Sequence, residues 1–368
     1  MPLIAVIQNY VKKNNLLEEQ EVLDAIFLAS VLPGPMAFNV VVGVGYRLRG
    51  IKGALVCGLG ALIPTIVLVL SLSVAYFQWG QVPIVERLFM GFTPAMVAIV
   101  LSAAWSMGGK TIKSVPELVI SLVACTMLLG IGGFYSTIGI VLGSGFAGWL
   151  LFRDSRTKPL EPSKSVPPVL SGSEPQGSSK LLSVSPLPAL WLLTIQPSLV
   201  LKLFTTFAAM SVTLFGSGYV FIPIIQDLVV NGQGWVTNKE FIDGLTISQI
   251  TPGPILITSA FIGYKVAGLL GAMSATVGMF LPPALLMLVG TYFLDSLKKS
   301  AVVKAALQGV RPAVVGMLVA AAFVVARTVP EHWASAVILA GTLIAIIRFR
   351  VEVALIIPVA AIAGLILY

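Results

Sequence analysis

Long apolar stretches alternate with short polar ones along almost the whole chain. In the first half the apolar stretches cover 22–45, 54–77, 88–108, 115–131 and 134–152. In the second half they cover 203–225, 241–264, 271–294, 305–325, 333–347 and 351–367, and a shorter one at 186–201 is interrupted by Pro197. A helix of about 20 apolar residues crosses the hydrocarbon core of a bilayer. The pattern therefore predicts an all-α polytopic membrane protein of about 12 transmembrane helices.

One segment departs from this pattern. Residues 153–185 are rich in Pro, Ser and Lys and show no hydrophobic period. Such a composition cannot bury a core and is typical of a flexible linker. We therefore expect an N-terminal unit at 1–152, a cytoplasmic linker at 153–185 and a C-terminal unit at 186–368.

The two units repeat one another. The first contains VLPGPMAFNVVVGVGYRLRGIKGA and the second ITPGPILITSAFIGYKVAGLLGA. The matched positions include Pro33-Gly34-Pro35 with Pro252-Gly253-Pro254, Gly45 with Gly263, Tyr46 with Tyr264, Arg47 with Lys265, Gly50 with Gly268, Gly53 with Gly271, and Pro64 with Pro282. So many Gly and Pro identities at fixed spacing are more than shared hydrophobicity produces, so they indicate an internal repeat.

The second unit also carries LFGSGYVFIP at 214–223, ahead of its Pro-Gly-Pro. The first unit has no counterpart, because the chain starts where that helix would end. The sequence therefore predicts that the N-terminal unit lacks its first helix, unless the start is mis-assigned.

Basic residues indicate how the units are oriented, since cytoplasmic loops carry an excess of Lys and Arg. A cytoplasmic linker places Lys110 and Lys113 on the same side as itself, and Arg47 with them. If 186–201 spans the membrane, Lys299 and Arg348 are cytoplasmic too. The matched Pro-Gly-Pro helices then run in opposite directions, so we predict an inverted repeat, as in many secondary transporters.

Composition agrees with a membrane protein. The chain is 57% hydrophobic and only 10% charged, whereas soluble domains carry about 25% charged residues. This excludes a soluble enzyme and a nucleic-acid reader. We therefore attribute the net charge of +8 to the basic loops that set the orientation of the helices in the membrane. With one histidine, two cysteines in apolar stretches and no phosphate loop or nucleophile elbow, we expect neither catalysis nor a metal or cofactor.

The two Pro-Gly-Pro elements fall inside apolar stretches, where two prolines around a glycine must kink or break a helix. Interrupted helices at matched positions are the best sequence indication of a midplane binding site, and the start of each half-helix favours an anion. The alternative is a structural kink with no ligand. The candidate substrate-binding residues are Pro33, Gly34, Pro35, Asn39, Gly216, Gly218, Gln249, Pro252, Gly253, Pro254, Thr258 and Arg311.

Four further charged residues are candidates for cationic potential or proton coupling. Arg47 and Lys265 lie at equivalent span ends, where an interfacial position is the alternative. Asp24 and Asp243 lie at matched helix starts, where acids also serve as ordinary dipole partners.

Taken together, the segment LFGSGYVFIPII, the segment EFIDGLTISQITPGPILITSAFIGYKVAGLLGA and the first unit's VLPGPMAFNVVVGVGYRLRGIKGA resemble the two-domain chromate ion transporter (CHR) family. The resemblance covers nearly the whole chain except the linker. It implies a multi-pass carrier of the bacterial inner membrane that exports chromate and confers chromate resistance, with two homologous halves of opposite orientation.

We therefore expect a secondary active transporter of chromate, with protons as the coupling ion and a homodimer as one open oligomeric state. Sulfate is a tetrahedral dianion of similar size, so a sulfate or other oxyanion carrier is one alternative. A non-transporting membrane subunit is the other, if the N-terminal unit is truly short by a helix.

Overall fold

The computed structural model describes residues 16–79, 83–152, 197–213, 221–251, 253–294, 300–349, 351 and 353–368, together with residues 7, 10, 11 and 14. Over these residues every regular element is a helix, which confirms the all-α prediction. The first half forms α2 (Glu19–Val31), α3 (Met36–Trp79), α4 (Pro83–Thr111), α5 (Val115–Gly130) and α6 (Gly133–Phe152). The second half forms α7 (Pro197–Val212), α8 (Ile222–Gln226), η3 (Asp227–Gly232), α9 (Asn238–Ile250), η4 (Ile255–Ile257), α10 (Thr258–Tyr292), α12 (Ala301–Ala326), α13 (Trp333–Phe349) and α14 (Val353–Leu367).

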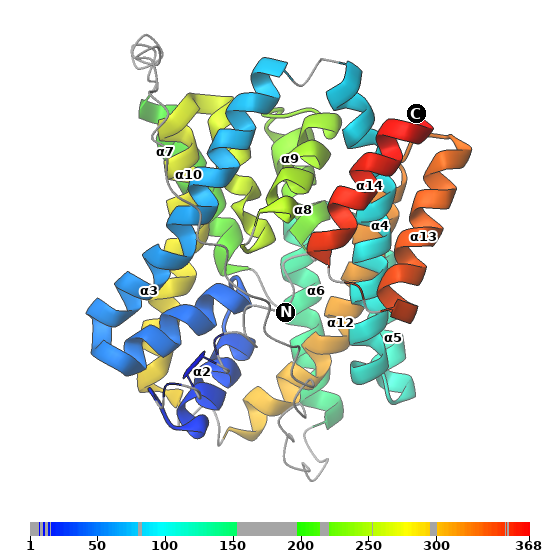
Figure 1. Cartoon of the computed structure of the whole chain (residues 1–368). Coiled ribbons are helices and arrows are strands. Elements are labelled where there is room, and N and C mark those ends of the chain that lie inside the picture. The colour runs from blue at the N-terminus through cyan, green and yellow to red at the C-terminus, as the bar shows by residue number, and fades with distance from the viewer. Residues whose placement is uncertain are drawn as a thin grey trace.

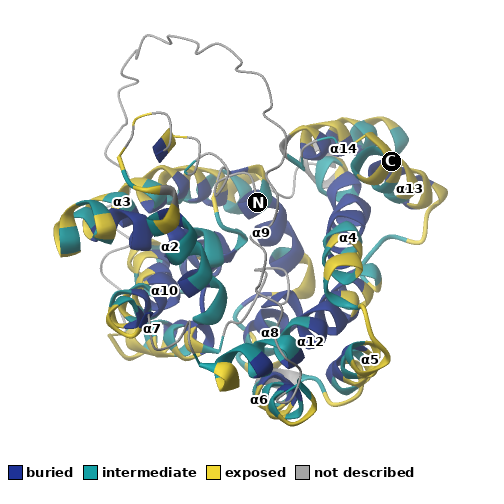
Figure 2. Cartoon of the chain, turned by 90° about the horizontal axis from the view of Figure 1, so that it is seen from below, coloured by how far each residue is buried: buried dark blue, intermediate teal, exposed yellow. Residues whose placement is uncertain are grey.

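The helices form two bundles, and each bundle draws on both halves of the chain (Figure 1). One bundle contains α2 and α3 from the first half with α7 and α10 from the second. The other contains α4, α5 and α6 with α12, α13 and α14. Figure 2 shows α8 and α9 between the bundles, and α9 contacts both α10 and α4.

In both α3 and α10 the chain reverses direction sharply at a glycine. Arg49 (φ −147°, ψ 34°) and Gly50 (φ 59°, ψ −146°) interrupt α3. Ala267 (φ −144°, ψ 31°) and Gly268 (φ 60°, ψ −149°) interrupt α10 in the same way. The positive φ suits glycine, which has no Cβ to clash. Each helix therefore consists of a short arm and a long arm, and the repeat seen in the sequence is also a repeat of backbone geometry.

A second pair of glycines lets the two arms of each hairpin touch. A Cβ on Gly45 would lie 2.5 Å from the carbonyl oxygen of Gly53, and one on Gly263 would lie 2.6 Å from the carbonyl carbon of Gly271. No side chain fits at these positions, so the matched glycines are required by close backbone contact.

The long arms of α3 and α10 run antiparallel. Tyr46, beside the turn of α3, donates a hydrogen bond from its hydroxyl to that of Tyr292 at the end of α10, at 3.1 Å. Conversely, Lys265, beside the turn of α10, lies 5.0 Å from the ring centre of Phe77 near the end of α3. The turn of each hairpin therefore meets the far end of the other.

In the second bundle, equivalent helices of the two halves make equivalent contacts. A Cβ on Gly91 of α4 would lie 2.7 Å from Cα of Gly364 in α14, and one on Gly148 of α6 would lie 2.7 Å from Cα of Gly309 in α12. Gly91 and Gly309 are matched positions of the repeat. Each of these two close contacts therefore joins a glycine of the first half to a glycine of the second half.

Four helical segments are long and apolar enough to cross a membrane, among the described residues: Met36–Trp79, Arg87–Thr111, Ile255–Tyr292 and Ala301–Ala326. Several shorter apolar helices accompany them. The long arm of α3 exposes a row of large apolar side chains, Leu55, Val56, Leu59, Ile63 and Val67. Such a face is suited to contact with lipid.

Three predicted features lie wholly or partly outside the described residues. They include the linker at 153–185 and most of the segment at 214–223, of which only 221–223 are described. Of the stretch 186–201, only its last part is described, and it begins α7 at Pro197.

Candidate functional site

The first Pro-Gly-Pro element separates two helices, as its sequence predicts. α2 ends at Val31 and α3 begins at Met36. Gly34 has φ 113°, which side-chain-bearing residues rarely adopt. The break is therefore rigidly specified by its residue types.

The side chain of Asn39 forms a hydrogen bond back to the first break. Its side chain is fully buried, and its amide Nδ2 donates to the carbonyl of Pro33 at 3.1 Å. This bond satisfies a carbonyl that the interruption would leave unpaired. Among the described residues, the other amide atom, Oδ1, has no partner.

The second break lies between α9 and α10. α9 ends at Ile250, and the chain resumes as η4 and then α10 at Thr258. The Thr258 hydroxyl lies 2.8 Å from the Ser248 hydroxyl and 2.6 Å from the Ile255 carbonyl, so its single proton is shared between these two acceptors. Thr258 therefore ties the end of α9 to the start of α10.

Next to Thr258, the side chain of Ser259 is fully buried. Its hydroxyl has no partner in the part of the chain that is described. Gln249, another candidate, lies half-buried near the end of α9 and is engaged in an interaction.

Each break packs against the long arm of the other half. A Cβ on Gly34 would overlap Pro283 of α10, with its Cγ at 2.7 Å, and a Cβ on Gly253 would lie 2.5 Å from Cγ2 of Thr65 in α3. Thr65 and Pro283 directly follow the matched prolines of the repeat, Pro64 and Pro282. The contact is therefore made twice, with the roles of the two halves exchanged.

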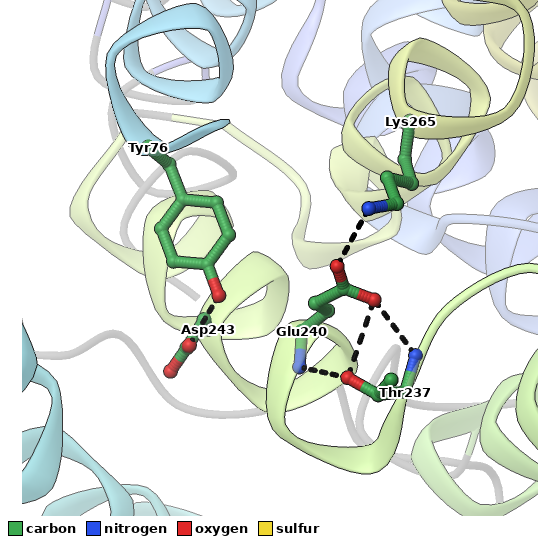
Figure 3. Close-up of polar contacts among 5 residues, drawn as sticks. All are labelled: Tyr76, Thr237, Glu240, Asp243 and Lys265. Carbon is green, nitrogen blue, oxygen red and sulfur yellow. Dashed lines mark hydrogen bonds and ion pairs between the residues drawn. The ribbon is translucent and has the colours of Figure 1, made fainter. Parts of the chain in front are cut away.

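Lys265 is paired rather than free. Its Nζ lies 2.8 Å from Oε1 of Glu240. The other carboxylate oxygen of Glu240 accepts bonds from the backbone N–H of Thr237 at 2.9 Å and from its hydroxyl at 3.2 Å (Figure 3). The start of α9 is thereby joined to the short arm of α10.

Desolvation of the Glu240 carboxyl raises its pKa, but the hydrogen bond and charge of Lys265 and the bonds from Thr237 outweigh this, so its pKa lies below the ordinary value. A lowered pKa contributes stability that is complete above the unfolded-state value and is lost as the pH falls through the folded-state value. We therefore expect the melting temperature in detergent to fall below about pH 4.3, and less steeply in Glu240→Gln. Because the pair is partly exposed, the effect is below about 1 kcal/mol.

The control for this measurement is Glu331→Gln, which changes an exposed glutamate ahead of α13. It shows how far the loss of an acidic side chain without the Lys265 pair changes the melting temperature. An equal slope in wild type and Glu240→Gln would contradict the assignment.

The matched aspartates lie in different surroundings. Asp243 is 4% exposed and accepts a hydrogen bond from the hydroxyl of Tyr76 at 2.6 Å (Figure 3). Asp24 instead borders a cavity of about 10 Å³, roughly the size of one water molecule, whose lining also includes Arg47 and Thr291. Asp24 also accepts a hydrogen bond from the side-chain amide of Gln20 at 3.1 Å, so the two matched aspartates have different partners.

Arg311 lies half-buried within α12. The main neighbours of α12 are α6, α5 and α4, which belong to the bundle that lacks the Pro-Gly-Pro breaks. The structure therefore places Arg311 on a different bundle from the candidates of α3 and α10, such as Asn39 and Thr258. Gly216, Gly218 and Pro252 lie outside the described residues.

Three residues of the site were not predicted from the sequence. Tyr76, Thr65 and Pro283 act through contacts with the opposite half, and a tyrosine or threonine in an apolar run carries no local signal of such a partner. For Thr65 and Pro283, their position directly after the matched prolines was the available indication.

The chain is similar to known membrane transporters. The family model described as "Chromate transporter" matches residues 1–149 and 201–365. A "Chromate transport protein" of Cupriavidus metallidurans is 27% identical over 351 residues, which cover 94% of this chain and 82% of that protein. A protein of the same name from Pseudomonas aeruginosa is 29% identical over a stretch that covers 82% of this chain and 70% of that protein.

A "Probable chromate transport protein" of Synechococcus elongatus is 27% identical, covering 87% of this chain and 78% of that protein. No solved structure matches the chain.

Proposed function

Because the chain belongs to the chromate transporter family, a family of transporters and not of enzymes, and is a multi-pass membrane protein, we propose that it carries chromate across the bacterial inner membrane. We further propose that it is a secondary active carrier that moves chromate outward, coupled to the proton gradient, and so confers resistance. The observation that carries this proposal is the matched pair of interrupted helices, each locked against the long arm of the opposite half.

Geometry supports a carrier in two ways. Interrupted helices bring free backbone N–H groups and the positive end of a helix dipole to the middle of the molecule, where an anion can bind. The antiparallel long arms of α3 and α10 and the reciprocal contacts favour an inverted repeat, in which rocking of one bundle against the other gives alternating access. The different surroundings of Asp24 and Asp243 support a role for these carboxylates in coupling to protons.

The proposal is tested by chromate flux. Everted membrane vesicles from cells expressing this chain should accumulate chromate when the membrane is energised, and vesicles without the chain should not. Dissipating the proton gradient should abolish accumulation. Accumulation that survives loss of the gradient would contradict proton coupling, and absence of any chromate flux would contradict the function.

Arg311 gives a second test. A cation in the membrane interior is costly and is retained for a role, and in a carrier of anions that role is to supply positive potential. Arg311→Ala is expected to lower chromate flux at least about tenfold, while Arg311→Lys keeps part of it because the charge remains. Arg348→Ala, at the end of α13, is the control and should transport normally. Unchanged flux in Arg311→Ala would remove this residue from the transport pathway.

A further inference from the structure

Two buried polar atoms at the breaks lack partners among the described residues, Oδ1 of Asn39 and Oγ of Ser259. Both side chains are fully buried. Burying a polar group without a partner costs free energy, so such groups are rare in proteins unless a ligand or water completes them. Each lies near the start of the half-helix that follows a break.

The direction of the Asn39 amide is fixed. The atom that faces the Pro33 carbonyl must be the donor Nδ2, because a carbonyl oxygen only accepts hydrogen bonds. The acceptor Oδ1 is therefore the amide atom without a bond to Pro33. The first break therefore offers a hydrogen-bond acceptor to a ligand.

Hydrogen-bond donors are present at both breaks. The backbone N–H of Asn39 donates to the Pro35 carbonyl at 2.9 Å. The N–H groups of residues 36–38 come before this bond in the first turn, where a helix offers its N–H groups no partner of its own. At the second break, the Thr258 hydroxyl is occupied, but the Ser259 hydroxyl is available to donate. The breaks thus offer several donors and one acceptor.

Resting on the proposed function, we propose that the anion carried is the singly protonated oxyanion, hydrogen chromate, and that Asn39 recognises its proton. A fully ionised oxyanion has only acceptor oxygens, which Asn39 Oδ1 would repel. The singly protonated form donates its O–H to Asn39 Oδ1 and accepts from Ser259 and the backbone N–H groups. It also carries one charge instead of two, which reduces the cost of leaving water.

This recognition would separate chromate from sulfate without a difference in size. Chromate takes up a proton near neutral pH, whereas sulfate does so only in strong acid. A site that requires an O–H donor therefore admits chromate and rejects sulfate, because an unpaired buried acceptor penalises an analogue that lacks the proton.

Chromate counterflow in proteoliposomes, with the same pH on both sides, tests this without a proton gradient. Selenate stays a dianion on both sides of neutral pH, while arsenate keeps at least one proton. We expect arsenate to inhibit wild-type counterflow and selenate to inhibit it at least about tenfold more weakly. We also expect the total chromate concentration that gives half-saturation to be higher at mildly alkaline than at mildly acid pH. Equal inhibition by selenate and arsenate, or a half-saturating chromate concentration that does not change with pH, would overturn the proposal. Absence of counterflow at every pH would instead overturn the proposed function.

Two variants test the residues. Asn39→Ala removes the repelling acceptor, so selenate should gain inhibition relative to arsenate; this gain is readable even if less protein folds. Ser259→Ala should raise the chromate concentration that gives half-saturation about tenfold. Ser211→Ala, which changes a buried serine bonded to the Ala208 carbonyl of its own helix, should leave it unchanged. An unchanged selenate-to-arsenate ratio in Asn39→Ala, or equal effects of the two serine variants, would contradict these roles.

Discussion

Gly53→Val is expected to prevent the chain from folding. A Cβ at Gly53 would overlap the carbonyl oxygen of Gly45, and these two glycines hold the arms of α3 together. Neither partner can move aside, because both contacts are made by backbone. Overpacking of a tight contact costs about 1–3 kcal/mol, and here the branched side chain must also force the hairpin open. We expect loss of monodisperse protein in detergent, measured by size-exclusion chromatography.

Gly60→Val is the matched control for this substitution. Gly60 lies in the same long arm and is exposed, and an added Cβ would have nothing within 4 Å. This variant should give normal yield and elution. Equal yields of the two variants would contradict the close contact between the arms.

The breaks should respond to substitution unequally, although they are equivalent in sequence. In Gly253→Ala the new methyl meets Cγ2 of Thr65 at 2.5 Å and Oγ1 at 2.7 Å, while Cβ is at 3.1 Å. Thr65→Ala removes the two closer atoms, so we expect the double variant to regain most of the chromate flux that Gly253→Ala loses.

Gly34→Ala should not be rescued in this way. Its φ of 113° strains any residue with a side chain by about 1–3 kcal/mol. The overlap is with the Pro283 ring, and alanine at 283 would still present a Cβ there. Flux assays on the four variants, with protein amounts matched by immunoblot, decide this. Rescue of Gly34→Ala by Pro283→Ala would contradict the backbone strain at Gly34, and no rescue of Gly253→Ala by Thr65→Ala would contradict the contact between Gly253 and Thr65.

The sequence was sufficient to predict the helical fold and the positions of the breaks, because proline and glycine act on the local backbone. α2 ends and α3 begins around Pro33 to Pro35, and α9 ends at Ile250 ahead of the second element. The matched glycines of the repeat were also visible in the sequence. Their purpose, backbone contact within a hairpin, was not, because a glycine in an apolar run is equally compatible with contacts between helices.

Contacts between distant residues could not be predicted. Tyr76 bonds to Asp243 across the two halves, and Lys265 is occupied by Glu240. Arg311 was predicted to bind the anion because it is a charge in an apolar run, but that pattern gave no indication that α12 packs mainly in the bundle without the breaks. A local pattern shows that a residue is unusual in its segment, but packing alone determines which partner it meets.

The most direct test of the central claim is chromate-for-chromate exchange by the purified chain in proteoliposomes. If the matched breaks form the site of a chromate carrier, vesicles loaded with unlabelled chromate should take up radiolabelled chromate saturably. This uptake should be lost in Gly253→Ala and return in Gly253→Ala with Thr65→Ala. No uptake above protein-free vesicles, or full uptake by a correctly folded Gly253→Ala protein, would contradict the account.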